Sequence, residues 1–277
     1  MEPFKVICAG GSDSSGGAGI QADLKAVIAR GCWGLSVITA LTAQNTKGVS
    51  GIYPVTPAFV GRQLDTVLKD IGVDALKTGM LPTEEIVHIV AKKIKKYKIT
   101  KVVVDPVMIA KGGKNLMSGK ARTSLVKNLL PLAFAVTPNI PEAEVLTKMK
   151  ITSIALMKEA AVKIHRMGVK NVLIKGGHPP GNKRSDAVDI LYDGSFYEFS
   201  SPRINSRDTH GTGCTFASAL AAGIARGENI VEAVWQAKIL ITAAIENAVN
   251  LGKGYGSVNA FGKNILTKNK PVKNPAI

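Results

Sequence analysis

The segment Lys101-Val-Val-Val-Asp105-Pro106 gives the clearest indication of the fold. Its run of three valines has the length and composition of a buried strand, and it ends at an acidic residue and a proline. Three more short apolar runs of this kind follow the same rule and end in glycine or in polar residues, at 75–79, 133–139 and 171–177. Continuous apolar strands of this length are typical of a parallel sheet that helices cover on both faces.

Segments with helical spacing of apolar residues separate these strands. Further strands are predicted at 4–9 and 35–41, and helices at 19–30, 57–71, 84–96, 119–129, 155–167, 213–226 and 230–250. A more exposed pair of strands is predicted over 186–204, turning at Asp193-Gly194. We therefore predict an α/β fold, a three-layer α/β/α sandwich with a mostly parallel central sheet. Residues 1–277 are expected to form one domain, with 262–277 as a basic, loose tail.

The order of the strands also predicts where a ligand binds. Thr78, Asp105, Asn139 and Lys175 each stand at the carboxyl end of one of the four apolar runs. In open α/β sheets, ligands occupy the crevice beyond these strand ends. We expect the four side chains to lie along one edge of the sheet and to border a ligand site.

The composition indicates a globular protein of the cytoplasm. Of its 277 residues, 45% are hydrophobic and 20% are charged, a balance that can bury a sizeable core. The three cysteines, Cys8, Cys32 and Cys214, are far apart and form no C-x-x-C pair, which argues against a disulfide framework or a zinc site. The sequence has no signal-peptide pattern and no apolar run long enough to span a bilayer, so no membrane partner is expected.

The formal charge of +16 raises nucleic acid as a possible partner. One lysine cluster, at 92–98, falls at the end of a predicted helix whose first turn carries Glu84 and Glu85, where it complements the helix dipole. A second cluster lies in the tail after Phe261. No zinc-finger spacing, RNA-binding signature or heptad repeat accompanies them, so a solvated basic surface is favoured and a nucleic-acid-binding protein is the rival class.

The segment Asp208-Thr-His-Gly211-Thr-Gly213-Cys214 directly precedes an alanine-rich helix. Two glycines one residue apart let the backbone turn tightly and expose successive N–H groups, which together with the helix dipole bind anions. The same field lowers the pKa of a thiol in the first turn, so we expect Cys214 to be accessible as a thiolate. The alternative is a glycine-rich loop that caps a helix around a small buried cysteine.

A second glycine-rich segment, residues 9–23, joins the first strand to the first helix and contains five glycines. It is not a P-loop, because no Gly-Lys-Ser/Thr follows, and it lacks the G-x-G-x-x-G spacing of a dinucleotide site. Close approach of its backbone to a small ligand is one interpretation. A flexible loop that caps the next helix is the other.

Seven motifs in a fixed order carry a resemblance to a known family. They are Gly-Ser-Asp-Ser-Ser-Gly-Gly-Ala-Gly-Ile-Gln-Ala-Asp at 11–23, Thr-Ala-Gln-Asn-Thr at 42–46, Lys-Thr-Gly-Met at 77–80, Asp-Pro-Val-Met at 105–108, Thr-Pro-Asn-x-x-Glu-Ala at 137–143, Lys-Gly-Gly-His at 175–178 and Thr-His-Gly-Thr-Gly-Cys-Thr at 209–215. Together they resemble the hydroxymethylpyrimidine/phosphomethylpyrimidine kinases of thiamine biosynthesis, in the ribokinase-like superfamily. The resemblance covers about residues 4–256.

The resemblance implies an ATP-dependent kinase and assigns its nucleotide side. Gly211, Gly213 and Cys214 would be catalytic, forming an anion hole and a proton-accepting group. Lys175, Gly176, Thr212 and Asn139 would bind the nucleotide, and Asp105 and Glu142 would hold Mg²⁺ partly through water. Two of these residues also have plain structural explanations. Glu142 can be a first-turn helix acid, and Lys175 can be a strand-end lysine that reaches solvent.

On the substrate side, the resemblance places a pyrimidine near Gln44, Asp23, Gly11, Met80 and Val107. The Gln44 amide offers both a donor and an acceptor, which match a ring nitrogen and the adjacent 4-amino group. In isolation, Gln44 could equally be a polar residue in a turn. The implied reaction phosphorylates 4-amino-5-hydroxymethyl-2-methylpyrimidine and then its monophosphate, and a pyridoxine or pyridoxal kinase of the same superfamily is the alternative. Relatives of this kind are often homodimers, which is a further expectation.

Overall fold

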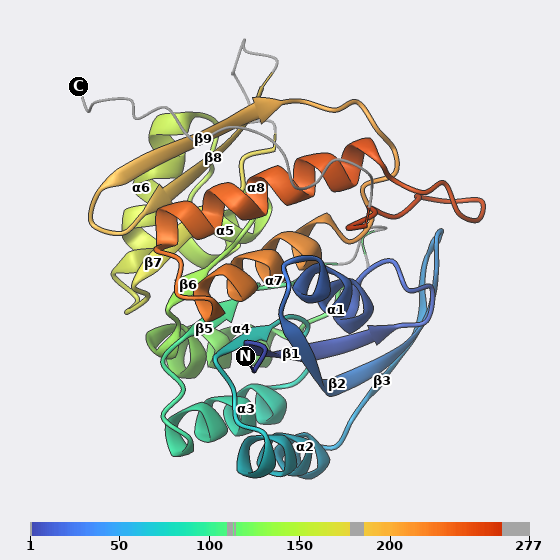
Figure 1. Ribbon diagram of the computed structural model, residues 1–277. Helices are drawn as coiled ribbons and strands as arrows, with labels where there is room; N and C mark the ends of the chain where they lie inside the picture. Colours follow the sequence, from blue (N-terminus) through green and yellow to red (C-terminus); the bar gives the residue numbers. More distant parts are fainter. Residues whose placement is uncertain (1, 110–112, 114, 178–185, 262–277) are drawn as a thin grey trace.

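The computed structural model describes residues 2–109, 113, 115–177 and 186–261, and its strands form one mixed sheet (Figure 1). Across the sheet the order is β3-β2-β1-β4-β5-β6-β7-β8-β9. The strands are β1 (Lys5–Asp13), β2 (Trp33–Asn45), β3 (Gly48–Pro54), β4 (Ala75–Thr78), β5 (Val102–Val104), β6 (Ala135–Val136), β7 (Asn171–Ile174), β8 (Asp186–Tyr192) and β9 (Phe196–Pro202). In this order, every neighbouring pair from β2 across to β7 is parallel. At one edge β3 pairs antiparallel with β2, and at the other β8 pairs antiparallel with β7 and β9 antiparallel with β8.

Helices cover both faces of this sheet. They are α1 (Gly19–Ala29), α2 (Pro57–Asp70), α3 (Glu84–Lys96), α4 (Gly119–Ser124), α5 (Ile140–Thr147), α6 (Ile154–His165), α7 (Thr212–Ala225) and α8 (Ile230–Glu246). Alternate residues of β1 show the two layers, since Ile7 packs in the core under α2, α3 and α6, whereas Val6 packs in the core under α7 and α8. The predicted α/β/α sandwich with a mostly parallel sheet is confirmed.

Three local features differ from the predictions. β2 does not end at residue 41 but continues through the polar residues to Asn45 and turns back as β3. Pairing with β3 extends β2 through residues that are mostly not apolar, so the apolar pattern gave no indication of this extension. The helix predicted over 119–129 is α4 followed by one π-helical turn at Leu125–Leu129. The short helix α5 had no predicted range; its first turn is closed by a capping box between Asn139 and Glu142.

Several sequence predictions lie partly or wholly outside the described residues. The basic tail at 262–277 is one. The sequence also predicts mobile loops near 109–115 and 177–185, and these segments fall largely in the gaps. The single-domain assignment of 1–277 stays a prediction for that reason. Within the described ranges, no helix has the length and apolar content required to cross a bilayer.

A buried ion pair joins three elements below the carboxyl edge of the sheet. Lys77 of β4 donates to both carboxylate oxygens of Asp23 of α1, at 2.8 and 2.9 Å, and both side chains are completely buried. The hydroxyl of Ser218, on α7, donates to the same carboxylate at 2.8 Å. Burial lowers the pKa of the Lys77 ammonium, but the neighbouring acidic groups, first among them the Asp23 carboxylate, together outweigh burial and raise that pKa above its ordinary value. The lysine is therefore charged, and the pair holds β4, α1 and α7 together.

Lys77→Met should lower the free energy of unfolding by about 3–5 kcal/mol, because it leaves the Asp23 carboxylate buried without a cation. The double variant Lys77→Met/Asp23→Leu should recover much of this loss, since no buried charge remains. Urea denaturation measures both, with Lys92→Met as the control, because Lys92 lies exposed on α3. A single variant as stable as the control would contradict the assigned role of the pair.

Candidate active site

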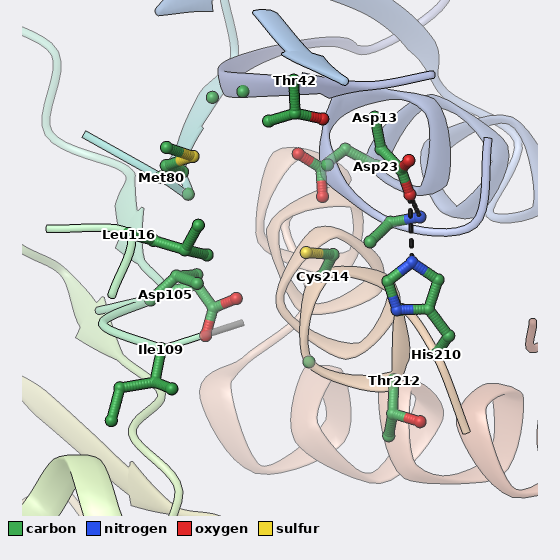
Figure 2. A pocket seen from close by; sticks show the side chains of 18 of the residues that line it. Asp13, Asp23, Thr42, Met80, Asp105, Ile109, Leu116, His210, Thr212 and Cys214 are labelled. Atoms are coloured by element: carbon green, nitrogen blue, oxygen red, sulfur yellow. Dashed lines mark hydrogen bonds and ion pairs between the residues drawn. The ribbon is translucent and has the colours of Figure 1, made fainter. Parts of the chain in front are cut away.

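One cavity of about 330 Å³ lies at the carboxyl edge of the parallel strands (Figure 2). Of the residues that sequence analysis singled out, it is lined by Gly11, Asp23, Gln44, Met80, Asp105, Val107, Asn139, Glu142, Lys175, Gly211, Thr212, Gly213 and Cys214. A second cavity, of about 530 Å³, shares Asn139, Lys175, Thr212 and Gly213 with the first and is also lined by Gly176. The structure thus brings every residue that was assigned a role to one of two adjoining cavities, while each role stays a prediction. Thr78, which was expected to border the site, is instead completely buried and lines neither cavity.

The first turn of α7 borders both cavities without a side-chain cap. Its N-cap is Gly211, in a left-handed conformation with φ of 84°, which has no side chain to cap the N–H groups that follow. The N–H of Thr212 donates to the carbonyl oxygen of Thr209 at 3.4 Å. α1 likewise has no capping side chain, whereas Thr56, Thr83, Ser118, Asn139, Ser153 and Asn229 cap the other described α-helices. Uncapped first-turn N–H groups together with the helix dipole form an anion-binding position.

The two glycine-rich segments pack directly against each other. A Cβ atom on Gly211 would lie 1.9 Å from the carbonyl oxygen of Gly17, and a Cβ on Gly17 would lie 2.5 Å from the ring of His210. Neither position has room for a side chain. The close approach of the two loops sets the N-terminal ends of α1 and α7 on the same side of the cavity.

Acidic and basic side chains alternate along the strand ends. The Lys175 ammonium donates to Asp105 Oδ1 at 3.1 Å, and Thr137 donates to the same oxygen at 3.3 Å. Glu142 accepts a hydrogen bond from the backbone N–H of Asn139 at 2.9 Å. Burial, with the nearby Asp105 carboxylate, raises the pKa of Glu142 to about 7, although Lys175 acts in the opposite direction. A cation bound nearby would therefore stabilise the ionised form of Glu142 and lower its pKa.

Cys214 lies on the cavity wall in the first turn of α7, but the expectation of a thiolate is wrong for the ligand-free protein. Burial raises the pKa of this thiol to about 12. The Lys77 ammonium lowers it, whereas Asp23 and Asp105 raise it further. The position at a helix start does not compensate for the loss of solvent around the sulfur and for the two acids, so Cys214 is protonated at neutral pH.

The substrate-side residues line the first cavity, and some are already bonded within the protein. Met80 is buried, and its sulfur would lie 3.0 Å from a Cβ on Gly11, so a larger residue at position 11 would require the methionine side chain to shift. Val107 is half-buried. Both oxygens of Asp23 are engaged by Lys77 and Ser218, so Asp23 acts first as a buried partner.

Among the cavity-lining residues to which sequence analysis gave no role are Thr42, His210, Asp13 and Lys77. Gln44 contacts Thr42 and His210, each at 3.1 Å, and His210 Nε2 lies 3.0 Å from Asp13. Lys77 is the fourth. All four stood in quoted motifs without an assigned role. For Lys77 a signal existed, because a lysine inside a continuous apolar strand requires a buried acid as its partner.

The fold and the site define a class of protein. A mostly parallel sheet bears, at its carboxyl edge, an uncapped helix start, a lysine, two carboxylates and a cavity of about 330 Å³. These are the features of the ribokinase-like kinases, which transfer a phosphoryl group to a small molecule.

Comparison with known proteins narrows the class to one family. The sequence profile of the phosphomethylpyrimidine kinase family matches residues 13–259. The hydroxymethylpyrimidine/phosphomethylpyrimidine kinase of Bacillus subtilis is 45% identical, over 98% of this chain and 100% of its own length. The thiamine biosynthesis bifunctional protein ThiED of Geobacter sulfurreducens is 56% identical over 92% of this chain, which spans about half (51%) of that relative.

A solved structure, the ADP complex of Bacillus subtilis pyridoxal kinase, superposes with a TM-score of 0.87 and 39% identity, over 94% of this chain and 98% of the other. The chain belongs to the phosphomethylpyrimidine kinase family, as the seven motifs predicted.

Alkylation by iodoacetamide should report the state of Cys214. Because its pKa is about 12, the rate of labelling at Cys214 should be low at neutral pH and should rise about tenfold per pH unit without a plateau up to about pH 10. Mass spectrometry of the Cys214 peptide measures the rate, and the peptide of buried Cys32 is an internal control. A labelling rate that levels off near pH 7 would show instead that Cys214 is a thiolate at neutral pH.

Proposed function

We propose that the protein uses ATP to phosphorylate 4-amino-5-hydroxymethyl-2-methylpyrimidine and then its monophosphate, giving the diphosphate used in thiamine biosynthesis. The observation that carries this proposal is that Gln44 and the uncapped start of α7 line the same cavity. The names of the relatives support the substrate, and the ADP complex of the pyridoxal kinase supports a nucleotide donor.

In the proposed reaction, the hydroxymethyl oxygen forms a bond to the γ-phosphorus while the bond from that phosphorus to the bridging oxygen of ADP breaks. The N–H groups after Gly211 would bind the oxygens of the transferred group, and Lys175, Gly176, Thr212 and Asn139 would bind the nucleotide. Phosphoryl transfer requires positioning and neutralised charge more than covalent chemistry, and these residues supply both.

The carboxylates present fit Mg²⁺ that is shared with the nucleotide. No cluster of three metal-ligating side chains occurs among the described residues, so the protein alone offers no closed cage. Mg²⁺ usually takes one or two carboxylates, waters and phosphate oxygens, and Asp105 and Glu142 can supply the first of these. Glu142, with its raised pKa, would ionise more readily beside the ion. Bound there, Mg²⁺ would neutralise charge on the phosphates.

Pyridoxal kinase activity is the second candidate, favoured by the structural similarity to the Bacillus subtilis enzyme. The two candidates differ at Gln44, whose amide matches the ring nitrogen and amino group of the pyrimidine, an arrangement that pyridoxal lacks. Assays of ADP release with the pyrimidine alcohol, its monophosphate and pyridoxal decide between them.

Gln44→Leu should raise the KM for the pyrimidine alcohol, because the substrate's amino group then stays unpaired in the cavity at a cost of about 1–3 kcal/mol. The KM for ATP should not change, since Gln44 lines only the first cavity. Unchanged kinetics with the pyrimidine would remove Gln44 from the substrate site, and faster turnover of pyridoxal than of both pyrimidines by the wild-type enzyme would favour the second candidate.

Cys214 would accept the proton of the hydroxymethyl group. Since the thiol pKa is about 12, the thiolate fraction rises with pH through the neutral range, so log kcat for the alcohol should rise with a slope near one between about pH 6 and 9. Cys214→Asp should reach its plateau at lower pH, because a carboxyl group ionises earlier. A wild-type profile as flat as that of the aspartate variant would contradict this role.

The two substrates separate the proton transfer from other roles of Cys214. Cys214→Ala should reduce turnover of the alcohol about 10²–10⁴-fold. The monophosphate, already anionic, needs no such base, so its turnover should fall much less. Equal losses for both substrates would assign Cys214 to the anion-binding loop.

A further inference from the structure

A chain of hydrogen bonds runs along one wall of the cavity from Asp13 through His210 and Gln44 to Thr42. His210 Nε2 lies 3.0 Å from Asp13 Oδ2 and 3.1 Å from one terminal atom of the Gln44 amide. The other terminal atom of that amide lies 3.1 Å from Thr42 Oγ1. Figure 2 shows Thr42 at one end of this wall and His210, beside Cys214, at the other.

The Asp13 carboxylate fixes the tautomer of His210. Asp13 is nearly buried and accepts hydrogen bonds from Ser15 through Oδ1 and from the backbone N–H of Ala18 through Oδ2. Burial alone would raise its pKa, but the hydrogen bonds from His210, Ser15 and Ala18 outweigh burial and hold the pKa below its usual value. An ionised carboxylate only accepts hydrogen bonds, so the ring nitrogen that faces it, Nε2 of His210, carries the hydrogen.

This tautomer determines which Gln44 atom can face His210. With its hydrogen in place, Nε2 of His210 has no lone pair, so an amide nitrogen beside it would find no acceptor, whereas the carbonyl oxygen of Gln44 can share that hydrogen with Asp13. In the structure, the Gln44 atom beside His210 is its amide nitrogen, Nε2, so two hydrogen-bond donors face each other. Half a turn of the amide exchanges oxygen and nitrogen at nearly the same positions, and the choice between the two follows from the hydrogen-bond network.

Thr42 leads independently to the same orientation. Its hydroxyl lies 3.0 Å from the carbonyl oxygen of Ser12, and because a hydroxyl has one hydrogen, that hydrogen is donated there. Thr42 Oγ1 can then only accept a hydrogen bond from Gln44, which requires the amide nitrogen on this side. Two separate constraints, one at each end of the amide, therefore agree that Oε1 lies on the side of His210 and Nε2 on the side of Thr42.

The orientation leaves one donor and one acceptor for a ligand, in a fixed order. Gln44 Nε2 keeps one hydrogen free on the Thr42 side, and Oε1 keeps one lone pair on the His210 side. In the pyrimidine of the proposed reaction, the 4-amino group stands between the ring nitrogen N3 and the 5-hydroxymethyl group. Pairing the amino group with Oε1 therefore turns the hydroxymethyl group toward His210 and the adjoining loop with Gly211 and Cys214. The opposite amide orientation would turn it toward Thr42.

We infer that Asp13 and His210 are positioning residues that fix the orientation of the Gln44 amide. Through it they direct the substrate's hydroxymethyl group toward the loop that carries Gly211 and Cys214. Neither residue needs to touch the reacting atoms. The inference rests on the proposed function for the identity of the ring, while the hydrogen-bond assignment rests on the ligand-free structure alone.

A matched pair of variants tests the positioning role. His210→Gln keeps an N–H donor near the position of Nε2, whereas His210→Met has nearly the same length without a donor. His210→Met should raise the KM for the pyrimidine alcohol about tenfold or more, with the KM for ATP changed less than about twofold, and His210→Gln should stay within about threefold of wild type. If both variants lose equally in Tm and in the KM for ATP, His210 supports only the folding of the loop and the inference is overturned.

A second measurement tests whether His210 acts through recognition of the substrate's 4-amino group. The Kd is measured by calorimetry for the pyrimidine alcohol and for its analogue without the 4-amino group, in wild type and in His210→Met. Removing the amino group should weaken binding about tenfold in wild type and about threefold or less in the variant, because Gln44 is then free to turn. Equal discrimination in both proteins would overturn the inference.

The tautomer can be read without any substrate. Long-range ¹H–¹⁵N NMR spectra of the ligand-free protein should show His210 with its hydrogen on Nε2, and a hydrogen on Nδ1 alone would overturn the assignment of Gln44. If wild type binds no pyrimidine, the proposed function fails. The NMR result then still decides whether Asp13 and His210 fix the amide.

Discussion

The ion pair between Lys77 and Asp23 is the interaction on which the site depends. It is completely buried, and it lies where β4, α1 and α7 come together beneath the cavity. Burying two charges is costly, and a well-packed apolar pair can be as stable or more stable. In this position, however, the pair fixes the two helices whose uncapped N-terminal ends face the cavity, and it supplies a fixed positive charge near Cys214.

The charges around the cavity follow from this arrangement. Lys77 and Lys175 each pair with an acid, Asp23 and Asp105, whereas the Asp13 carboxylate is held by hydrogen bonds. An incoming phosphate group and its metal ion would redistribute these contacts without requiring new charged groups. Such preorganised charge is favourable for phosphoryl transfer, because little reorganisation is needed when charge develops on the moving group.

Much of the fold could be predicted from the sequence because the apolar strands are continuous and end in polar residues. Residues 101–106 alone indicate a buried parallel strand with Asp105 at the ligand edge, and the structure places Asp105 there. The extension of β2 to Asn45 could not be predicted in the same way, because cross-strand pairing with β3 stabilises polar residues that lack any apolar alternation.

The site shows the same division between local and non-local information. The glycines and Cys214 were recognisable because their spacing before a helix is a local property of the chain. The pKa of Cys214 and the partners of His210 depend on residues nearly two hundred positions away, such as Asp13 and Asp23, and only the folded arrangement brings these together. Sequence analysis therefore identified the glycine-rich segment before α7 as a cavity-lining segment but misjudged the ionisation of its cysteine.

The central claim is that one cavity holds the pyrimidine against Gln44 and aims its hydroxyl group at the start of α7. A crystal structure with the pyrimidine alcohol, Mg²⁺ and a non-hydrolysable ATP analogue tests this most directly. The account predicts the ring paired with Gln44, its hydroxymethyl oxygen beside the sulfur of Cys214, and the γ-phosphate on the N–H groups that follow Gly211. A ring bound away from Gln44, or a γ-phosphate distant from the first turn of α7, would contradict the account.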